Sequence, residues 1–156
     1  MRIPIQSVTP ETGHAEICGF VHEVRDLGGL AFFLIRDRTG ILQVTIPKKK
    51  VSEAVLAAAK AVSRESVVRI SGQIKAVEKA PGGRELIPES FEIISLAETP
   101  LPLDVSEKVS VELDTRLDGR FLDVRSPRVA AVFALRSAAM HALNDYFHRE
   151  GFISIT

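Results

Sequence analysis

Apolar residues dominate three short segments within residues 19–46, and two turn sequences rich in Asp and Gly, at 26–29 and 37–40, separate these segments. The segment GFVHEVRDLGGLAFFLIRDRTGILQVTI therefore predicts three β-strands joined by tight turns. The first strand covers about 15–25, and Gly19 within it is typical of a bend or a bulge. We expect the rest of the chain to be organised around these strands.

The middle strand carries two adjacent aromatic residues, Phe32 and Phe33. Successive side chains on a strand point to opposite faces, so both rings cannot enter one core. On the third strand, Gln43 and Thr45 share the face opposite to its regularly spaced Leu and Val residues. An exposed ring beside a polar amide on a curved sheet can stack a nucleic-acid base and hydrogen-bond its edge.

A helix and two further strands follow. Ser52 can cap a short helix, SEAVLAAAKAVSR, and a fourth strand is predicted over 66–78. A hairpin sequence at 80–83 leads to a fifth strand over about 84–96, in which Pro88 indicates an edge or a bulge. The inner face of the fourth strand is expected to carry Val68, Ile70, Ile74 and Ala76.

This order of elements predicts a mainly β fold, a five-stranded OB-fold Greek-key barrel with a helix between its third and fourth strands. A linker and a long C-terminal α-helix are expected to follow the barrel. OB-folds bind oligonucleotides or oligosaccharides, but a fold does not by itself determine a function.

The composition changes near Thr99, where prolines alternate with other residues in TPLPLD. Such a segment is stiff and lacks hydrogen-bond donors, as in a domain linker. We therefore expect an OB-fold domain at 1–99 with a loose lead-in over 1–14, a charged and irregular linker at 100–126, and the start of a further domain at 127–156.

The last part of the chain combines a helix with a possible strand. Ser126 and Pro127 are typical of a helix start, and Gly151 of its end. Residues 152–156 are predicted to begin a strand. A long helix and a strand without a sheet of their own indicate a piece of a larger protein.

Composition narrows the possible functions. Lys and Arg (20) balance Asp and Glu (20), so nucleic-acid binding would have to come from a local patch and from stacking. Cys18 is the single cysteine, which excludes an internal disulfide and suits a reducing compartment. No apolar run reaches membrane-spanning length, and the first residues lack the apolar core of a signal peptide, so we expect a cytoplasmic protein.

The segment GFVHEVRDLGGLAFFLIRDRTGILQV closely resembles the anticodon-binding OB domain of class II aspartyl-tRNA synthetases. PLPLD, LDTRLDGRFLDVRSP and REGFISIT are similar to the linker and first class motif of those enzymes, in the same order. The short hairpin APGGRELIPE is typical of the archaeal and eukaryotic type. The resemblance covers nearly the whole chain from Ala15 onward.

The resemblance implies four residues that bind the tRNA anticodon. Phe32 would stack on the central base, Gln43 would hydrogen-bond it, Arg25 would be a basic contact, and Glu85 would read another base. Each has a simpler interpretation. Phe32 could belong to the core with Phe33 outside, and the polar residues could be ordinary surface side chains.

His22 and Pro81 bear on which tRNAs are bound. Members of this family that are restricted to aspartate tRNA tend to carry Trp at the position of His22 and often Lys near Pro81. The chain therefore resembles the non-discriminating members, which aspartylate both aspartate and asparagine tRNAs. Those tRNAs differ at the third anticodon base, and an indole can narrow a pocket that an imidazole leaves open. The alternative is that His22 is a neutral surface histidine.

The resemblance also implies that the complete enzyme is a homodimer that uses ATP and Mg²⁺ to aspartylate tRNA(Asp) and tRNA(Asn). The second and third class motifs are absent from the sequence, so we assign it no catalytic residue and no bound cofactor. Its four histidines are scattered, and no metal site is predicted. Neither DNA nor a membrane is an expected partner.

Three alternatives remain open. The barrel could belong to an asparaginyl- or lysyl-tRNA synthetase, although a His-Leu-Arg block usually replaces RFLDVR in the asparagine enzyme. It could be a general single-stranded nucleic-acid-binding domain, or a purely structural dimerisation module.

Overall fold

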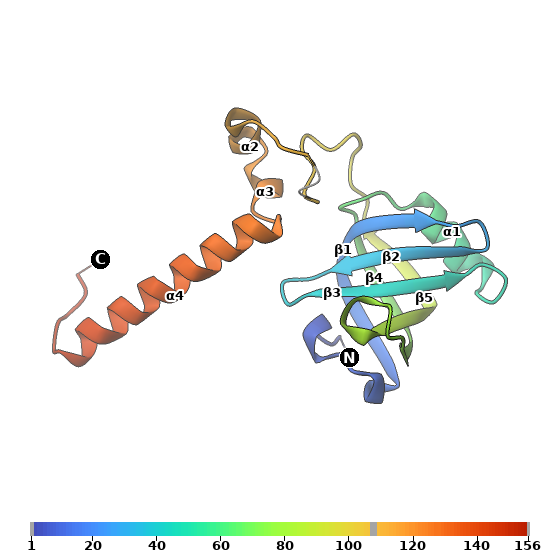
Figure 1. Cartoon of the computed structure of the whole chain (residues 1–156), viewed down its shortest axis with the longest axis horizontal. Coiled ribbons are helices and arrows are strands. Elements are labelled where there is room, and N and C mark those ends of the chain that lie inside the picture. Colours follow the sequence, from blue (N-terminus) through green and yellow to red (C-terminus); the bar gives the residue numbers. More distant parts are fainter. Residues whose placement is uncertain (1, 107–108, 156) are drawn as a thin grey trace. The chain divides into compact units, whose positions relative to one another are not determined.

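In a computed structural model that describes residues 2–106 and 109–155, five β-strands close into a barrel (Figure 1). Around the barrel the order is β1-β2-β3-β5-β4, and the contact between β3 and β5 is parallel while the other pairs are antiparallel. The predicted OB-fold is confirmed, with one helix between β3 and β4 in the chain. The elements are β1 (His14–Asp26), β2 (Leu30–Arg36), β3 (Ile41–Pro47), α1 (Glu53–Ala61), β4 (Val67–Ala76) and β5 (Arg84–Ser95).

Strand β1 bends and changes partner in its middle. Its first half pairs with β4 and its second half with β2, and Phe20 pairs with both. A Cβ atom at Gly19 would lie 2.6 Å from the carbonyl oxygen of Arg36, so only glycine permits this close approach of the strands. Gly19 therefore lies at the bend, and the bulge itself occurs between Val21 and Glu23.

The two adjacent rings of β2 lie on opposite faces of the strand. Phe33 is 1% exposed and packs edge to face on Phe91 at a centroid distance of 5.6 Å, whereas Phe32 is only partly buried. The inner set predicted for β4 holds except for Ala76, which is exposed. Ala76 pairs with Arg84 where the hairpin begins, beyond the packed layers of the core.

The lead-in is ordered rather than loose. Ile5 and Val8 are buried in the barrel core, and the Ile5 N–H donates to a carboxylate oxygen of Asp37 at 2.9 Å. Two short 3₁₀ turns, Ile5–Ser7 and Pro10–Thr12, carry the chain to β1. The apolar residues of the lead-in have no regular spacing, which is why the pattern did not reveal its buried positions.

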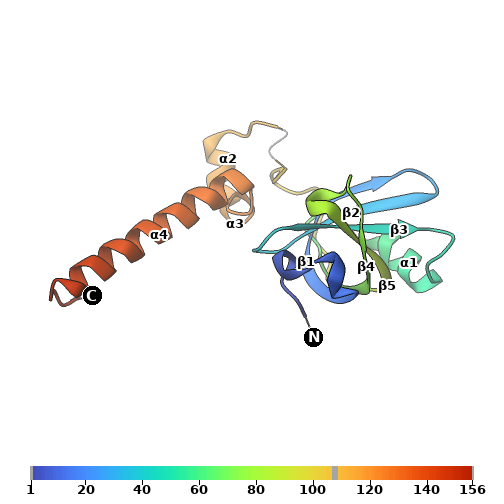
Figure 2. The same cartoon turned by 60° about the horizontal axis from the view of Figure 1, so that its bottom comes forward.

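Helix α1 and strand β5 follow the predictions. The Ser52 hydroxyl accepts a hydrogen bond from the Val55 N–H at 3.3 Å, and Val55 is buried. The helix lies against β5 (Figure 2). The pairing of β4 with β5 slips between Ser71 and Gly72, opposite Pro88, so the proline lies at a bulge.

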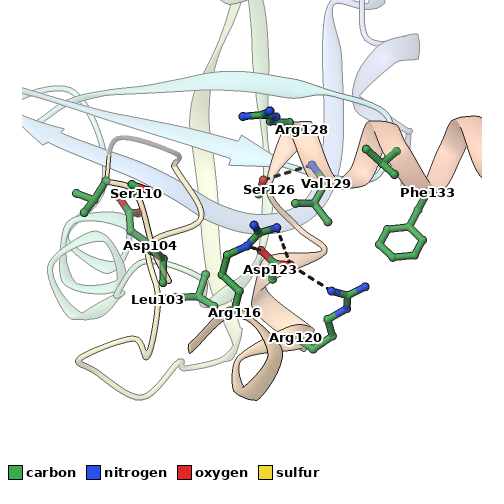
Figure 3. Close-up of a pocket in the computed structure, with 13 residues that line it drawn as sticks. Leu103, Asp104, Ser110, Arg116, Arg120, Asp123, Ser126, Arg128, Val129 and Phe133 are labelled. Carbon is green, nitrogen blue, oxygen red and sulfur yellow. Dashed lines mark hydrogen bonds and ion pairs between the residues drawn. The ribbon is translucent and has the colours of Figure 1, made fainter. Parts of the chain in front are cut away.

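Residues 100–156 form a second compact unit, distinct from residues 1–99. It contains α2 (Leu113–Asp118), α3 (Arg120–Asp123) and α4 (Pro127–Arg149), so the expectation of an irregular linker is wrong for 113–123. Asp123 is 3% exposed and accepts a hydrogen bond from Arg116 at 2.8 Å, while Arg120 lies at 3.6 Å (Figure 3). These side chains line a cavity of about 480 Å³.

Helix α4 begins as predicted, because the Ser126 hydroxyl accepts from the Val129 N–H at 3.5 Å. None of its residues is buried. Residues 152–155 form no strand, contrary to the prediction, and Thr156 lies outside the described residues. A strand needs a neighbour to satisfy its backbone, and Phe152 instead packs on Phe147 at a centroid distance of 5.4 Å. Within the described residues, every helix is too short or too polar to cross a membrane.

Candidate nucleic-acid interface

Two rows of side chains cross the outer face of β1, β2, β3 and β5. The strand register sets both rows, because residues directly opposite each other on paired strands share a face. The rows are Arg25, Phe32 and Thr45, and next to them Glu23, Leu34, Gln43 and Glu85.

A cavity of about 450 Å³ opens on this face. Five of the six site residues predicted from the sequence line it, and the sixth, His22, does not. The residues that line it are Glu23, Arg25, Leu27, Phe32, Leu34, Gln43, Val77, Lys79, Ala80, Pro81 and Glu85. The fold thus brings together an aromatic ring, an amide, a carboxylate and a guanidinium from separate strands.

Gln43 and Glu85 are joined in a small hydrogen-bond network. The Gln43 Nε2 donates to Glu85 Oε2 at 3.1 Å and to Thr45 Oγ1 at 3.2 Å, and Thr45 Oγ1 donates to the same Glu85 oxygen at 2.5 Å. Within the described residues, Gln43 Oε1 and Glu85 Oε1 have no donor. The network therefore fixes two side chains while leaving each with a free acceptor in the cavity.

Hydrogen bonds fix charged side chains near the end of β1 and at the β1–β2 turn. The Arg25 guanidinium donates twice to Glu23 Oε1, both at 3.2 Å. At the β1–β2 turn, Lys48 binds both carboxylate oxygens of Asp26 at 2.7 Å. The hydrogen bond from Lys48, followed by that from the Gly28 N–H, lowers the pKa of Asp26. The cavity therefore presents the Arg25 cation beside the carboxylate of Glu23.

Sequence reasoning missed Thr45 and Glu23 as parts of the site. Strand parity placed Thr45 on the face of Gln43, but its partner Glu85 is 40 residues away in sequence. The parallel contact of β3 with β5 brings them together, and local patterns carry no signal for that pairing. The residue spacing of β1 also gave no indication that Glu23 would face outward.

His22 lies away from the cavity and is not the surface histidine considered above. It is 9% exposed, and its Nδ1 accepts a hydrogen bond from Arg36 at 2.8 Å. Burial, followed by the positive charge of Arg36, lowers the pKa of His22. Its imidazole is therefore held in the neutral form, with the proton on Nε2.

No group of three or more His, Cys, Asp or Glu side chains in the described part of the chain is arranged to hold a metal ion. The side chains that line the cavity offer stacking, hydrogen bonding and charge. Together these suit the recognition of unpaired bases.

Comparison with known proteins gives three consistent findings. Residues 15–94 match the family described as the OB-fold nucleic acid binding domain. The chain is 67% identical over 155 residues to the aspartate–tRNA(Asp/Asn) ligase of Methanoculleus marisnigri, covering 99% of this chain and 36% of that protein. It is 50% identical over 140 residues to the aspartate–tRNA(Asp) ligase of Pyrococcus furiosus, covering 90% of this chain and 32% of that protein.

A solved structure shows the same fold. The asparaginyl-tRNA synthetase of Pyrococcus horikoshii matches with a TM-score of 0.88 and 30% identity, over 100% of this chain and 36% of that one. The chain therefore spans 36% or less of the length of these relatives.

Proposed function

Because the chain belongs to the OB-fold nucleic acid binding domain family, we propose that its outer cavity binds a tRNA anticodon within an aspartate–tRNA ligase. The observation that carries this proposal is the arrangement of Phe32 next to the Gln43–Glu85 network on the exposed face of the barrel. The identity of 67% to an aspartate–tRNA ligase, against 30% to an asparaginyl-tRNA synthetase, favours aspartate as the amino acid.

The geometry supports a different contact with RNA for each of these side chains. Phe32 offers its ring for stacking, which contributes about 1–3 kcal/mol per base. The free Gln43 Oε1 can accept a hydrogen bond from uracil N3–H, and uracil is the central anticodon base for both aspartate and asparagine. The free Glu85 Oε1 can accept from an amino or imino group of a neighbouring base. Arg25 supplies positive charge for a phosphate.

We further propose that both tRNA(Asp) and tRNA(Asn) are bound. The Methanoculleus marisnigri relative, at 67% identity, is named for both tRNAs. The Pyrococcus furiosus relative, at 50% identity, is named for tRNA(Asp) alone. Pro81 lines the cavity and offers no charged group with which to select the third base. Since His22 does not line the cavity, any effect it has on this choice must be indirect.

For the whole protein, the proposal includes ATP- and Mg²⁺-dependent activation of aspartate, a homodimer and a cytoplasmic location. These points follow from the ligase family and not from the residues of the cavity.

The proposal is tested with fluorescently labelled anticodon stem-loops that carry the aspartate, asparagine or an unrelated anticodon. We expect the chain to bind the first two with similar affinity and the third at least about tenfold more weakly, since each lost base contact costs on the order of 1–3 kcal/mol. Fluorescence anisotropy gives the dissociation constants. Equal binding to all three RNAs would leave a general single-strand binder, and no binding would leave a structural module.

Replacing Gln43 with alanine is expected to weaken binding of the aspartate stem-loop by about two- to tenfold, the value of one hydrogen bond. The chain offers a matched control. Gln73 on β4 donates to Glu89 at 3.0 Å on an exposed surface outside the cavity. Gln73→Ala should bind as the unaltered chain does, and an equal loss in both variants would contradict the assigned role of Gln43.

A further inference from the structure

Three polar side chains are buried together beside the bulge of β1. His22, Arg36 and Glu65 are 9%, 8% and 4% exposed, and in the ion pair Arg36 Nη2 donates to both Glu65 oxygens at 3.0 and 2.9 Å. Arg36 Nη1 donates to His22 Nδ1 at 2.8 Å. Burying charges is costly unless they are fully paired, so a cluster of this kind in a small barrel requires a physical reason.

Residues 64–66, which precede β4, hold the bulge of β1 through hydrogen bonds. The Glu65 N–H donates to the Val21 carbonyl at 2.7 Å, and the Val21 N–H donates to the Ser66 carbonyl at 2.9 Å. Arg64 Nε donates to the His22 carbonyl at 3.2 Å. Among the described residues Glu65 is the only non-glycine with positive φ, at 64°, a conformation that persists only where its surroundings enforce it.

The bulge determines which side chains of β1 reach the cavity. Before it, Ala15, Ile17 and Val21 point into the core at odd positions, and after it the odd positions Glu23 and Arg25 point outward. His22 is the extra residue, because Val21 pairs with Ile35 and Glu23 with Leu34. Without the bulge, strict alternation would direct Glu23 and Arg25 toward the core.

We propose that Arg36, Glu65 and His22 are positioning residues for anticodon binding, which hold the β1 bulge so that Glu23 and Arg25 enter the cavity. This inference rests on the proposed function. It explains how His22, which does not line the cavity, can affect binding: it acts through the bulge and not by touching RNA.

The cluster makes RNA binding depend on pH. A guanidinium only donates hydrogen bonds, so His22 Nδ1 must be unprotonated to accept from Arg36. The charged groups that face the imidazole are Arg36 and Arg64, which oppose its protonation, and Glu65 and Glu23, which favour it. Burial adds to the effect of the arginines and lowers the pKa of His22. Protonation would break the contact with Arg36 and release the bulge.

The first test is the pH profile of aspartate stem-loop binding by the full chain, at a temperature where circular dichroism shows it folded throughout. Below the lowered pKa of His22, affinity should fall by up to about tenfold per pH unit, because the bound form requires the neutral imidazole. His22→Gln should flatten this profile. His14→Gln, which alters an exposed histidine 3.2 Å from Glu89, should leave the profile unchanged. A flat profile in the unaltered chain, or an unchanged one in His22→Gln, overturns the inference.

The second test separates positioning from folding. Single changes remove one partner of a buried ion pair, which is strongly destabilising, but the double variant Arg36→Met with Glu65→Leu replaces the pair by apolar groups, which proteins often tolerate. We expect this folded variant to lose the same affinity as Arg25→Ala, and adding Arg25→Ala to it should cost nothing further. Fully additive losses would show that the cluster does not act through Arg25.

If the unaltered chain binds no stem-loop, the proposed function itself is wrong. Selective binding with a flat pH profile and additive losses refutes only this inference.

Discussion

Phe32→Ala is expected to weaken binding of the aspartate anticodon stem-loop by about 5- to 150-fold, the equivalent of the roughly 1–3 kcal/mol that stacking contributes. Phe32 is partly exposed and lines the outer cavity, so its loss should leave the barrel folded. Fluorescence anisotropy measures the affinity, and circular dichroism reports the fold.

Phe33→Leu is the matched control for this prediction, because the neighbouring ring faces the core and contacts Phe91 at 5.6 Å. Losing an aromatic pair costs about 0.5–1.5 kcal/mol beyond the lost burial, so this variant should unfold at a lower urea concentration. Its affinity for RNA should stay within about twofold of the unaltered chain while it is folded, since surface chemistry is unchanged. If binding were instead lost only in Phe33→Leu, Phe32 would not be the ring that stacks on the base.

Gly72→Ala is expected to lower the free energy of unfolding of the barrel by at least about 3 kcal/mol, the upper end of the usual cost of overpacking. A Cβ atom at this position would lie 2.0 Å from the carbonyl oxygen of Ile87 and 2.9 Å from the Cα of Pro88. Both are backbone atoms, so no side-chain rotation can relieve the clash. Urea denaturation followed by circular dichroism measures the loss.

Gly29→Ala provides the control for the glycine prediction. No heavy atom lies within 4 Å of a Cβ atom there, and its φ is not in the left-handed region. The substitution should be neutral or stabilising by up to about 1 kcal/mol, because alanine restricts the unfolded chain. Equal stability of Gly72→Ala and the unaltered chain would contradict the close approach of β4 and β5 at the Pro88 bulge.

Local patterns predicted the elements of the barrel with good accuracy. Alternation required one of Phe32 and Phe33 to lie outside the core, and the family resemblance named Phe32; the structure buries Phe33 and leaves Phe32 and Gln43 on the outer face. Ser52 and Ser126 cap helices as predicted, because a capping hydroxyl binds an N–H group three residues away. These outcomes depend only on neighbours in sequence, whose relative directions follow from the backbone geometry of strand or helix.

Predictions failed where an element depends on a distant partner. Residues 152–155 have the composition of a strand but no strand beside them, so they form none. Asp123 is buried and accepts a hydrogen bond from Arg116. Two short helices form in this segment, where the many charged residues suggested an irregular linker. Ile5 belongs to the core although no periodic run of apolar residues surrounds it in sequence.

Local patterns were therefore enough to predict the OB-fold, one exposed ring on the middle strand and an amide on the outer face of the third strand. The contact between Glu85 and Gln43 becomes apparent only in the folded chain, because it depends on β3 lying parallel to β5. The burial of His22 and the outward direction of Glu23 also depend on the fold, because a single extra residue in β1 reverses which positions face the core. Alternation is a local property of the backbone, whereas a bulge is maintained by contacts with residues more than 40 positions away, such as that from Arg64 to His22 with a separation of 42.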